Sequence, residues 1–114
     1  GEPLRPVQGP ATDIVFMYST ADGEGLTSAF PNQVGRFTVR ARDRLFRAVP
    51  CTPEPFHVVI RGRQTVTTTV TPNKDGSIGI EYSIAVCGTY KIHIRGGKKG
   101  THIFGSPYTL TVKA

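Results

Sequence analysis

The feature that most constrains this chain is a set of apolar residues at every second position. The longest unbroken run consists of Ile78, Ile80, Tyr82, Ile84 and Val86. Side chains on a β-strand point alternately to the two faces of a sheet, so this period of two predicts strands with one buried face. The same alternation recurs in the segments 36–42, 56–61, 66–70, 90–95 and 108–113, and we expect a first strand within residues 13–18. No long window has the apolar spacing of a helix.

Turn-forming pairs and short Gly- or Pro-containing segments separate these strands, among them Asp22-Gly23, Arg61-Gly62, Asp75-Gly76 and Gly96-Gly97. About seven short strands with regular turns predict an all-β, immunoglobulin-like β-sandwich of two antiparallel sheets, A-B-E-D and C-F-G. In this scheme strand C is the segment 56–61, strand D the segment 66–70, strand E the segment 78–86 and strand F the segment 90–95. A length of 114 residues suits one such domain. We expect the domain to span residues 13–114, and residues 1–12, with three prolines, to be a linker or an irregular first strand.

Several motifs follow one another in a characteristic order. The segment 100–112 reads Gly-Thr-His-Ile-Phe-Gly-Ser-Pro-Tyr-Thr-Leu-Thr-Val, and the segment 87–92 before it reads Cys-Gly-Thr-Tyr-Lys-Ile. Gly-Glu-Gly-Leu at 23–26 and Asp-Gly-Ser at 75–77 occur earlier in the chain. Together they resemble the filamin-type immunoglobulin-like repeat (filamin/ABP280 repeat) over roughly residues 13–112. The sequence Gly-Glu-Gly-Leu at 23–26 is similar to that of filamin-type domains that occur singly, for example in tripartite-motif ubiquitin ligases.

The resemblance gives two residues structural roles. It places Tyr90 at a tyrosine corner, where a buried ring bonds through its hydroxyl to the nearby backbone, and Gly88 at the tight turn before it. The sequence departs from the family pattern at Cys87, where a proline is usual, and at Tyr108, where phenylalanine is common. These changes indicate a divergent relative of the repeats found in actin cross-linkers.

The sequence contains no recognisable catalytic or metal-binding motif. His57, His93 and His102 lie on different strands without a nearby carboxylate or thiol pattern. The glycine-rich segment 96–100 lacks the spacing and the Lys-Ser/Thr ending of a phosphate-binding loop. We therefore expect a domain that is not an enzyme, uses no cofactor or metal, and serves as a protein-binding scaffold module.

The predicted topology leaves strands C and D as sheet edges, and an exposed edge can accept an extended peptide. The resemblance implies that a ligand adds as a strand beside C, over the groove between C and D. The partner-binding residues that follow are Phe56, His57, Val58, Val59, Ile60, Arg61, Thr68 and Val70. Of these, Phe56, Val58 and Ile60 are expected in the core, and His57 and Val59 are expected to point outward. The alternative is an edge blocked by the N-terminus or by another domain.

The net charge of +6 favours an anionic partner. The outward positions of strands C and F form one basic face, consisting of His57, Arg61, Lys91, His93 and Arg95. This face could bind an acidic peptide or phosphate. Nucleic acid or an anionic membrane is the second alternative, ranked lower because the face lacks aromatic stacking positions and a recognition helix. A structural spacer between domains is the third.

Cys51 precedes strand C and Cys87 lies between strands E and F, so the fold places them at opposite ends of the sandwich. We predict two free thiols, because a disulfide requires Cα atoms within about 7 Å. Free thiols suit a reducing, cytoplasmic compartment. The chain has no apolar run long enough to cross a membrane, and we expect a monomeric domain within a longer chain.

Overall fold

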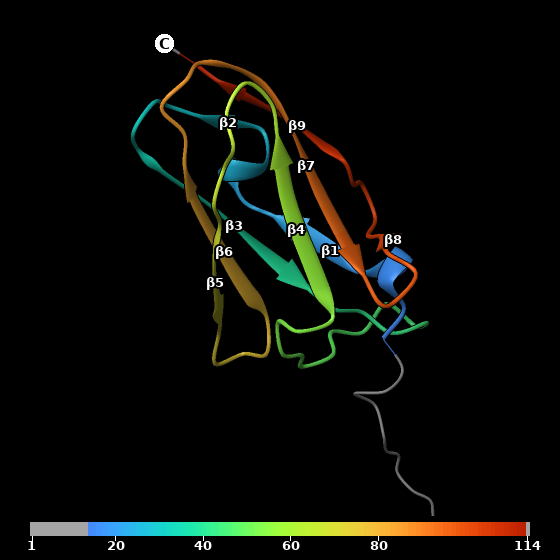
Figure 1. The fold of residues 1–114 in the computed structure, drawn as a ribbon. Coiled ribbons are helices and arrows are strands. Elements are labelled where there is room, and N and C mark those ends of the chain that lie inside the picture. Colours follow the sequence, from blue (N-terminus) through green and yellow to red (C-terminus); the bar gives the residue numbers. More distant parts are fainter. Residues whose placement is uncertain (1–13, 114) are drawn as a thin grey trace, which may run out of the picture.

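The structure, a computed structural model, describes residues 14–113 as two β-sheets packed face to face (Figure 1). The expected linker at residues 1–12 lies outside the described residues. The strands are β1 Thr20–Asp22, β2 Ser28–Ala29, β3 Val34–Arg40, β4 Phe56–Arg61, β5 Thr69–Pro72, β6 Ile78–Ser83, β7 Gly88–Gly96, β8 Thr101–His102 and β9 Tyr108–Val112. Two short 3-10 helices, η2 Phe16–Tyr18 and η3 Glu24–Leu26, complete the described elements.

The order of the strands confirms the predicted immunoglobulin-like topology. One sheet runs β1-β3-β6-β5, and the other runs β2-β9-β7-β4, with β8 paired to β7. Strand A of the prediction is divided in two. β1 pairs antiparallel with β3, and after η3 the chain crosses to the second sheet, where β2 pairs parallel with β9. Strands C and D correspond to β4 and β5, the last strands of the two sheets on the same side.

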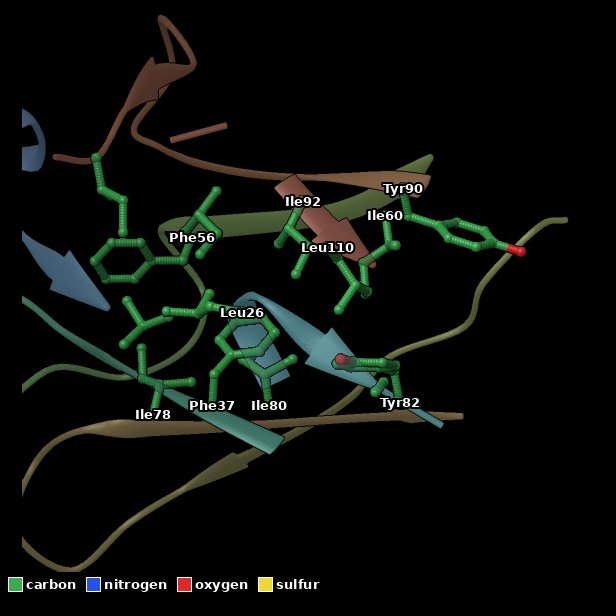
Figure 2. Packing of buried hydrophobic residues seen from close by; sticks show 14 of the residues in the cluster. Leu26, Phe37, Phe56, Ile60, Ile78, Ile80, Tyr82, Tyr90, Ile92 and Leu110 are labelled. Atoms are coloured by element: carbon green, nitrogen blue, oxygen red, sulfur yellow. The ribbon is translucent and has the colours of Figure 1, made fainter. Parts of the chain in front are cut away.

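The apolar residues of the alternating segments form one core between the sheets. Figure 2 shows side chains from both sheets pointing into the space between them. Tyr90 has no exposed surface, and its hydroxyl donates to the Val86 carbonyl oxygen at 2.7 Å. Gly88 has a φ of 147°, which glycine adopts readily. The tyrosine corner that the resemblance implied is therefore present.

The strand predicted within residues 13–18 is wrong. The described part of this segment ends in the helix η2, and the first strand begins only at Thr20. The Phe16 ring packs edge-on against Phe56, with ring centroids 5.3 Å apart, in space that a side chain at Gly96 would fill. Phe16 is thus partly buried against the core, and its segment packs at one end of the sandwich instead of forming a strand.

Two strand boundaries also differ from the prediction. The alternation at 66–70 predicts a strand, but β5 begins at Thr69, and β6 ends at Ser83 although the apolar alternation continues to Val86. The side chain of Gln64 explains the second difference. Its Oε1 accepts hydrogen bonds from the Ala85 and Val86 amides, both at 2.9 Å, and so takes the place of a strand partner.

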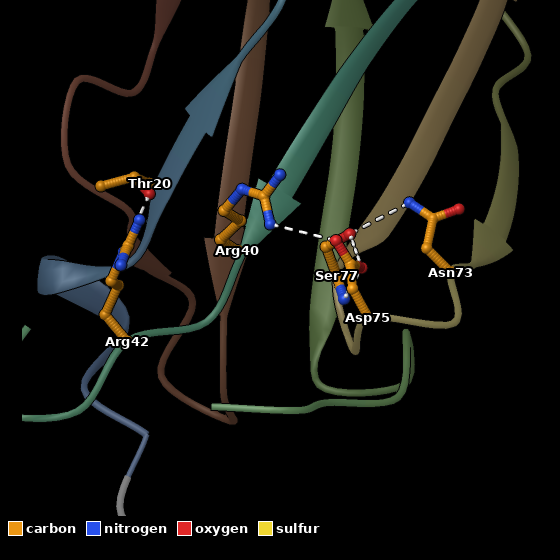
Figure 3. Close-up of polar contacts among 6 residues, drawn as sticks. All are labelled: Thr20, Arg40, Arg42, Asn73, Asp75 and Ser77. Atoms are coloured by element: carbon orange, nitrogen blue, oxygen red, sulfur yellow. Dashed lines mark hydrogen bonds and ion pairs between the residues drawn. The ribbon is translucent and has the colours of Figure 1, made fainter. Parts of the chain in front are cut away.

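The turn between β5 and β6 is held by a carboxylate (Figure 3). Asp75 accepts hydrogen bonds from the Ser77 hydroxyl and from the Ser77 amide at 2.9 Å, and Arg40 of β3 approaches it at 3.3 Å. The Ser77 hydrogen bonds, with the Arg40 guanidinium adding to them, lower the pKa of Asp75 below its ordinary value of 3.8. This turn therefore fixes the end of β5 relative to β3 and β6.

Candidate functional site

The candidate site is the free edge of β4 and the groove that separates it from β5. Within residues 14–113, β4 pairs only with β7, and β5 pairs only with β6. No described segment is hydrogen-bonded to the other side of β4. The alternative that the N-terminus blocks this edge therefore finds no support in residues 14–113.

The backbone of β4 presents specific hydrogen-bonding groups to this edge. The Gly97 amide donates to the Pro55 carbonyl oxygen at 2.9 Å, and β4 then pairs with β7 in the register Phe56↔Gly96 to Arg61↔Lys91. Hydrogen-bonded and non-hydrogen-bonded pairs alternate along an antiparallel ladder. The amides and carbonyls of residues 57, 59 and 61 therefore face β7, whereas those of Val58 and Ile60 face the open side.

The edge of β5 is less suitable for pairing. The Asn73 amide donates to the Ser77 carbonyl oxygen at 2.9 Å, and the same alternation turns the backbone of Val70 and Pro72 to the open side. Proline has no amide donor and is a common means of protecting an edge strand. β5 is also only four residues long, compared with six for β4. The edge of β4 is thus longer than that of β5 and is not interrupted by proline.

A mostly apolar groove of about 400 Å³ runs between the two edges. Its walls include Phe56, His57, Val58 and Val59 of β4, together with Thr68 and Val70. Phe56 and Ile60 are buried and Val58 is half-buried, whereas His57, Val59 and Arg61 are exposed. Ile60 and Arg61 do not line the groove.

Part of this groove was not predicted from the sequence. Val39, Ile78 and Ile80 form part of its lining, and Pro53 and Glu54 also line it. The three apolar residues were recognised as inward-facing members of alternating strands. What the pattern could not show is that these three buried residues form the floor of the groove between β4 and β5.

The outer face of the second sheet carries a separate basic pocket of about 250 Å³. Its lining consists of His57, Val59, Arg61, His93, Arg95, Gly97, Lys98 and Gly100. The structure thus brings together four of the five residues of the predicted basic face and adds Lys98 from the β7–β8 turn. Lys91 does not line the pocket, and its ammonium group donates to the Thr109 hydroxyl at 2.6 Å.

Cross-strand pairing places like charges directly opposite each other on this face. Arg61 of β4 lies opposite Lys91 of β7. Such pairs of like charges destabilise a sheet. The ion pairs among the described residues are Arg36–Glu81, Arg40–Asp75 and Arg47–Asp43, all outside the pocket. No carboxylate lines the pocket, so its positive charge is uncompensated there.

A short hydrogen-bond chain next to the pocket holds His102. Arg95 Nε donates to His102 Nε2 at 3.1 Å, which leaves the His102 proton on Nδ1, 2.7 Å from the Ser106 hydroxyl oxygen. The His93 ring lies 5.8 Å from the His102 ring. Its Nδ1 atom is shielded from solvent and has no hydrogen-bond partner among the described residues. Burial, assisted by the charge of Arg95, lowers the pKa of His93 below its ordinary value of 6.5.

The two cysteines are free thiols, as the predicted topology required. Cys51 lies in the connection between β3 and β4, and Cys87 in the connection between β6 and β7. These connections occupy opposite ends of the sandwich in Figure 1. Among residues 14–113 there is no cluster of three potential metal ligands, and no helix is both long and apolar enough to span a bilayer.

Comparison with known proteins identifies the family. The profile of the filamin/ABP280 repeat matches residues 15–109, and the chain belongs to this family. It is 28% identical to Filamin-A of Drosophila melanogaster over 110 residues, which is 95% of this chain and 5% of that protein. The chain therefore spans only a small part of this curated relative.

Solved structures confirm the fold. The crystal structure of the Lin-41 filamin domain matches with a TM-score of 0.76 at 22% identity, covering 89% of this chain and 97% of that one. The Escherichia coli adhesin FdeC matches with a TM-score of 0.66 at 16% identity, covering 89% of this chain and 33% of that one. The filamin repeat is a non-catalytic structural and protein-interaction module, and this domain is one of them.

Proposed function

We propose that the domain binds an extended segment of a partner protein, which adds as a strand along the free edge of β4. The observation that carries the proposal is the unpaired backbone of Val58 and Ile60 beside an apolar groove. An added strand would direct alternate side chains into the groove, where Val58, Val70 and Ile80 would contact them. Its remaining side chains would lie on the outer face, beside His57 and Val59.

The expected affinity follows from these contacts. The amides and carbonyls of Val58 and Ile60 offer four backbone groups, and each hydrogen bond contributes about 0.5–1.5 kcal/mol net. Apolar ligand side chains add burial against Val70, which is 41% exposed in the free domain. Thr68 makes part of the groove polar. We expect micromolar binding, about −8 kcal/mol.

The proposal extends to the setting of the domain. We place it in a reducing, cytoplasmic compartment, a location that its two free thiols support. We also propose that it is one module of a longer scaffold protein, such as an actin cross-linker or a tripartite-motif ubiquitin ligase. The small share of Filamin-A that the chain covers is consistent with a module of this kind.

The test replaces Val59, which is 43% exposed on the outer side of β4, with aspartate. Val59→Asp should leave the domain folded and weaken binding, because the charge faces the added strand. Val34→Asp is the matched control, since Val34 is exposed on β3 of the other sheet. Amide chemical shifts are followed during titration with candidate partner peptides. Shifts that cluster on β1 and β3, and a Val59→Asp protein that binds as the native protein does, would reject the β4 site.

The basic pocket supports a second candidate, binding of nucleic acid or an anionic membrane. The supporting observation is its uncompensated positive charge. No Phe, Tyr or Trp lines the pocket to stack on bases. Any such binding should therefore weaken steeply with salt and show little sequence preference. Tight, salt-resistant and sequence-selective binding would reverse the ranking of the two candidates.

A further inference from the structure

The apolar groove and the basic pocket lie on opposite sides of the same strand. His57 and Val59 line both of them. A strand paired to β4 would therefore have its groove-facing side chains on one side and its outward side chains next to the pocket. The Cβ atoms of directly opposite residues on neighbouring strands lie about 5 Å apart. An outward side chain of the added strand could therefore extend over β4 and reach the pocket.

The charge of the pocket indicates what such a side chain would carry. Arg61, Arg95 and Lys98 contribute three positive charges, and no carboxylate lines the pocket. A single carboxylate would leave most of this charge uncompensated, whereas a phosphate monoester carries a charge of about −1.5 to −2 and three acceptor oxygens. Arginine forks also match phosphate geometry.

A second observation points to the same ligand. The Nδ1 atom of His93 is shielded from solvent and unpaired among the described residues, although buried polar atoms are normally hydrogen-bonded. The Nε atom of Arg95 is already occupied by His102, which orients the guanidinium group. The pocket thus combines an oriented guanidinium group with a lining residue, His93, whose Nδ1 atom is unsatisfied.

We propose that this pocket receives the phosphate group of a phosphorylated serine or threonine, located on the outward side of the peptide strand that pairs with β4. The inference rests on the proposed strand addition and specifies the chemistry of the partner. The ligand would alternate apolar residues with polar ones, one of which is phosphorylated. A peptide fits better than RNA, because the pocket adjoins an open strand edge and has no Phe, Tyr or Trp platform.

Proton uptake should accompany phosphate binding at His93. The charged and titratable groups around its ring are His57 and Arg61 of β4, Lys91 and Arg95 of β7, His102 of β8, and Lys98 of the β7–β8 turn. Burial and the positive charges of Arg95, Arg61 and Lys91 hold the pKa of His93 below 6.5 in the free domain. A bound phosphate would offset them and raise that pKa. Phosphopeptide affinity should then increase as the pH falls from 8 towards about 6, where the phosphate itself begins to take up its second proton.

The experiment has two arms. In the first, inorganic phosphate is titrated into the domain while the imidazole signals of His57, His93 and His102 are followed. In the second, three capped peptides of sequence Val-Thr-Val-Xaa-Val-Thr-Val are compared, with serine, phosphoserine or glutamate at the central position. We expect phosphate to shift the His93 signal, and phosphoserine to bind about tenfold tighter than serine, with glutamate between them.

Two variants each remove one positive charge from the pocket, and a third variant serves as the control. Lys98→Gln should reduce the phosphoserine preference severalfold without changing affinity for the serine peptide, and Arg61→Gln should reduce that preference as well. Lys74→Gln removes the same charge at the exposed turn between β5 and β6, and should change neither value.

The outcomes separate the two proposals. Equal binding of the three peptides, with no effect of phosphate on His93, would overturn the phosphate site and leave strand addition intact. Failure of all three peptides to bind, together with a phosphate-induced His93 shift, would count against strand addition, and phosphate would then enter the pocket by another route. Preferential binding of oligouridylate, or of vesicles rich in phosphatidylserine, through Arg61 and Lys98 would assign the pocket to nucleic acid or membrane instead.

Discussion

Gly62 shows how one residue supports the tyrosine corner. It follows β4 directly, and a Cβ atom built on it would overlap the buried ring of Tyr90. Tyr90 cannot move aside, because its ring is surrounded by the core and its hydroxyl is bonded to Val86. Glycine at this position is therefore required by close packing.

Gly62→Ala should consequently lower the free energy of unfolding by about 1–3 kcal/mol, the usual cost of overpacking. Gly79→Ala is the control, because the nearest atoms to a Cβ at Gly79 lie 3.5 Å away. That substitution should be neutral or stabilise the domain by up to about 1 kcal/mol. Urea unfolding of the two variants measures both values. Equal effects would contradict the packing argument.

At the scale of elements, the hairpin of β5 and β6 depends on Asp75. Its pKa is lowered by the Ser77 hydrogen bonds and by Arg40, so the folded state favours the ionised carboxylate. The stabilisation is fully present above about pH 4, the unfolded pKa range of aspartate, and is lost as the pH falls through the lower folded value.

Asp75→Asn should therefore unfold more easily than the native domain at pH 7, with a difference that shrinks below about pH 4. Thermal unfolding of both proteins across pH 2 to 8 measures it. A difference that stays constant over the whole range would mean that the charge of Asp75 contributes nothing.

Most strands could be predicted because their alternation reflects a physical requirement. β3, β4, β6, β7 and β9 each bury one face, and the period of two is visible in the sequence. η2 could not be predicted in this way. Its position depends on Phe16 finding space above Gly96, a residue 80 positions away, and no local pattern records that contact.

The candidate site was predictable to a similar extent. Alternation and topology place His57 and Val59 outward on an edge strand, and the structure agrees. Lys98 was missed because it lies in a turn, where no periodicity indicates direction. The sequence also could not predict which backbone groups of β4 face the open side, because this depends on the register with β7.

At the scale of the whole molecule, the domain is held together by its core without a covalent cross-link between Cys51 and Cys87. Its denaturant midpoint should therefore be the same with and without a reducing agent. Burial raises the pKa of the Cys51 thiol above its ordinary value of 9.0, so its reaction with Ellman's reagent should accelerate only at alkaline pH. A midpoint that falls on reduction would contradict this account.

The central claim is that a partner strand pairs with the open side of β4, and amide hydrogen exchange tests it most directly. The amides of Val59 and Arg61 already bond to β7, whereas those of Val58 and Ile60 face the open edge. A bound peptide should slow exchange at Val58 and Ile60 and leave Val59 and Arg61 little changed. Uniform protection along β4, or protection confined to β5 or to the outer face, would contradict strand addition at this edge.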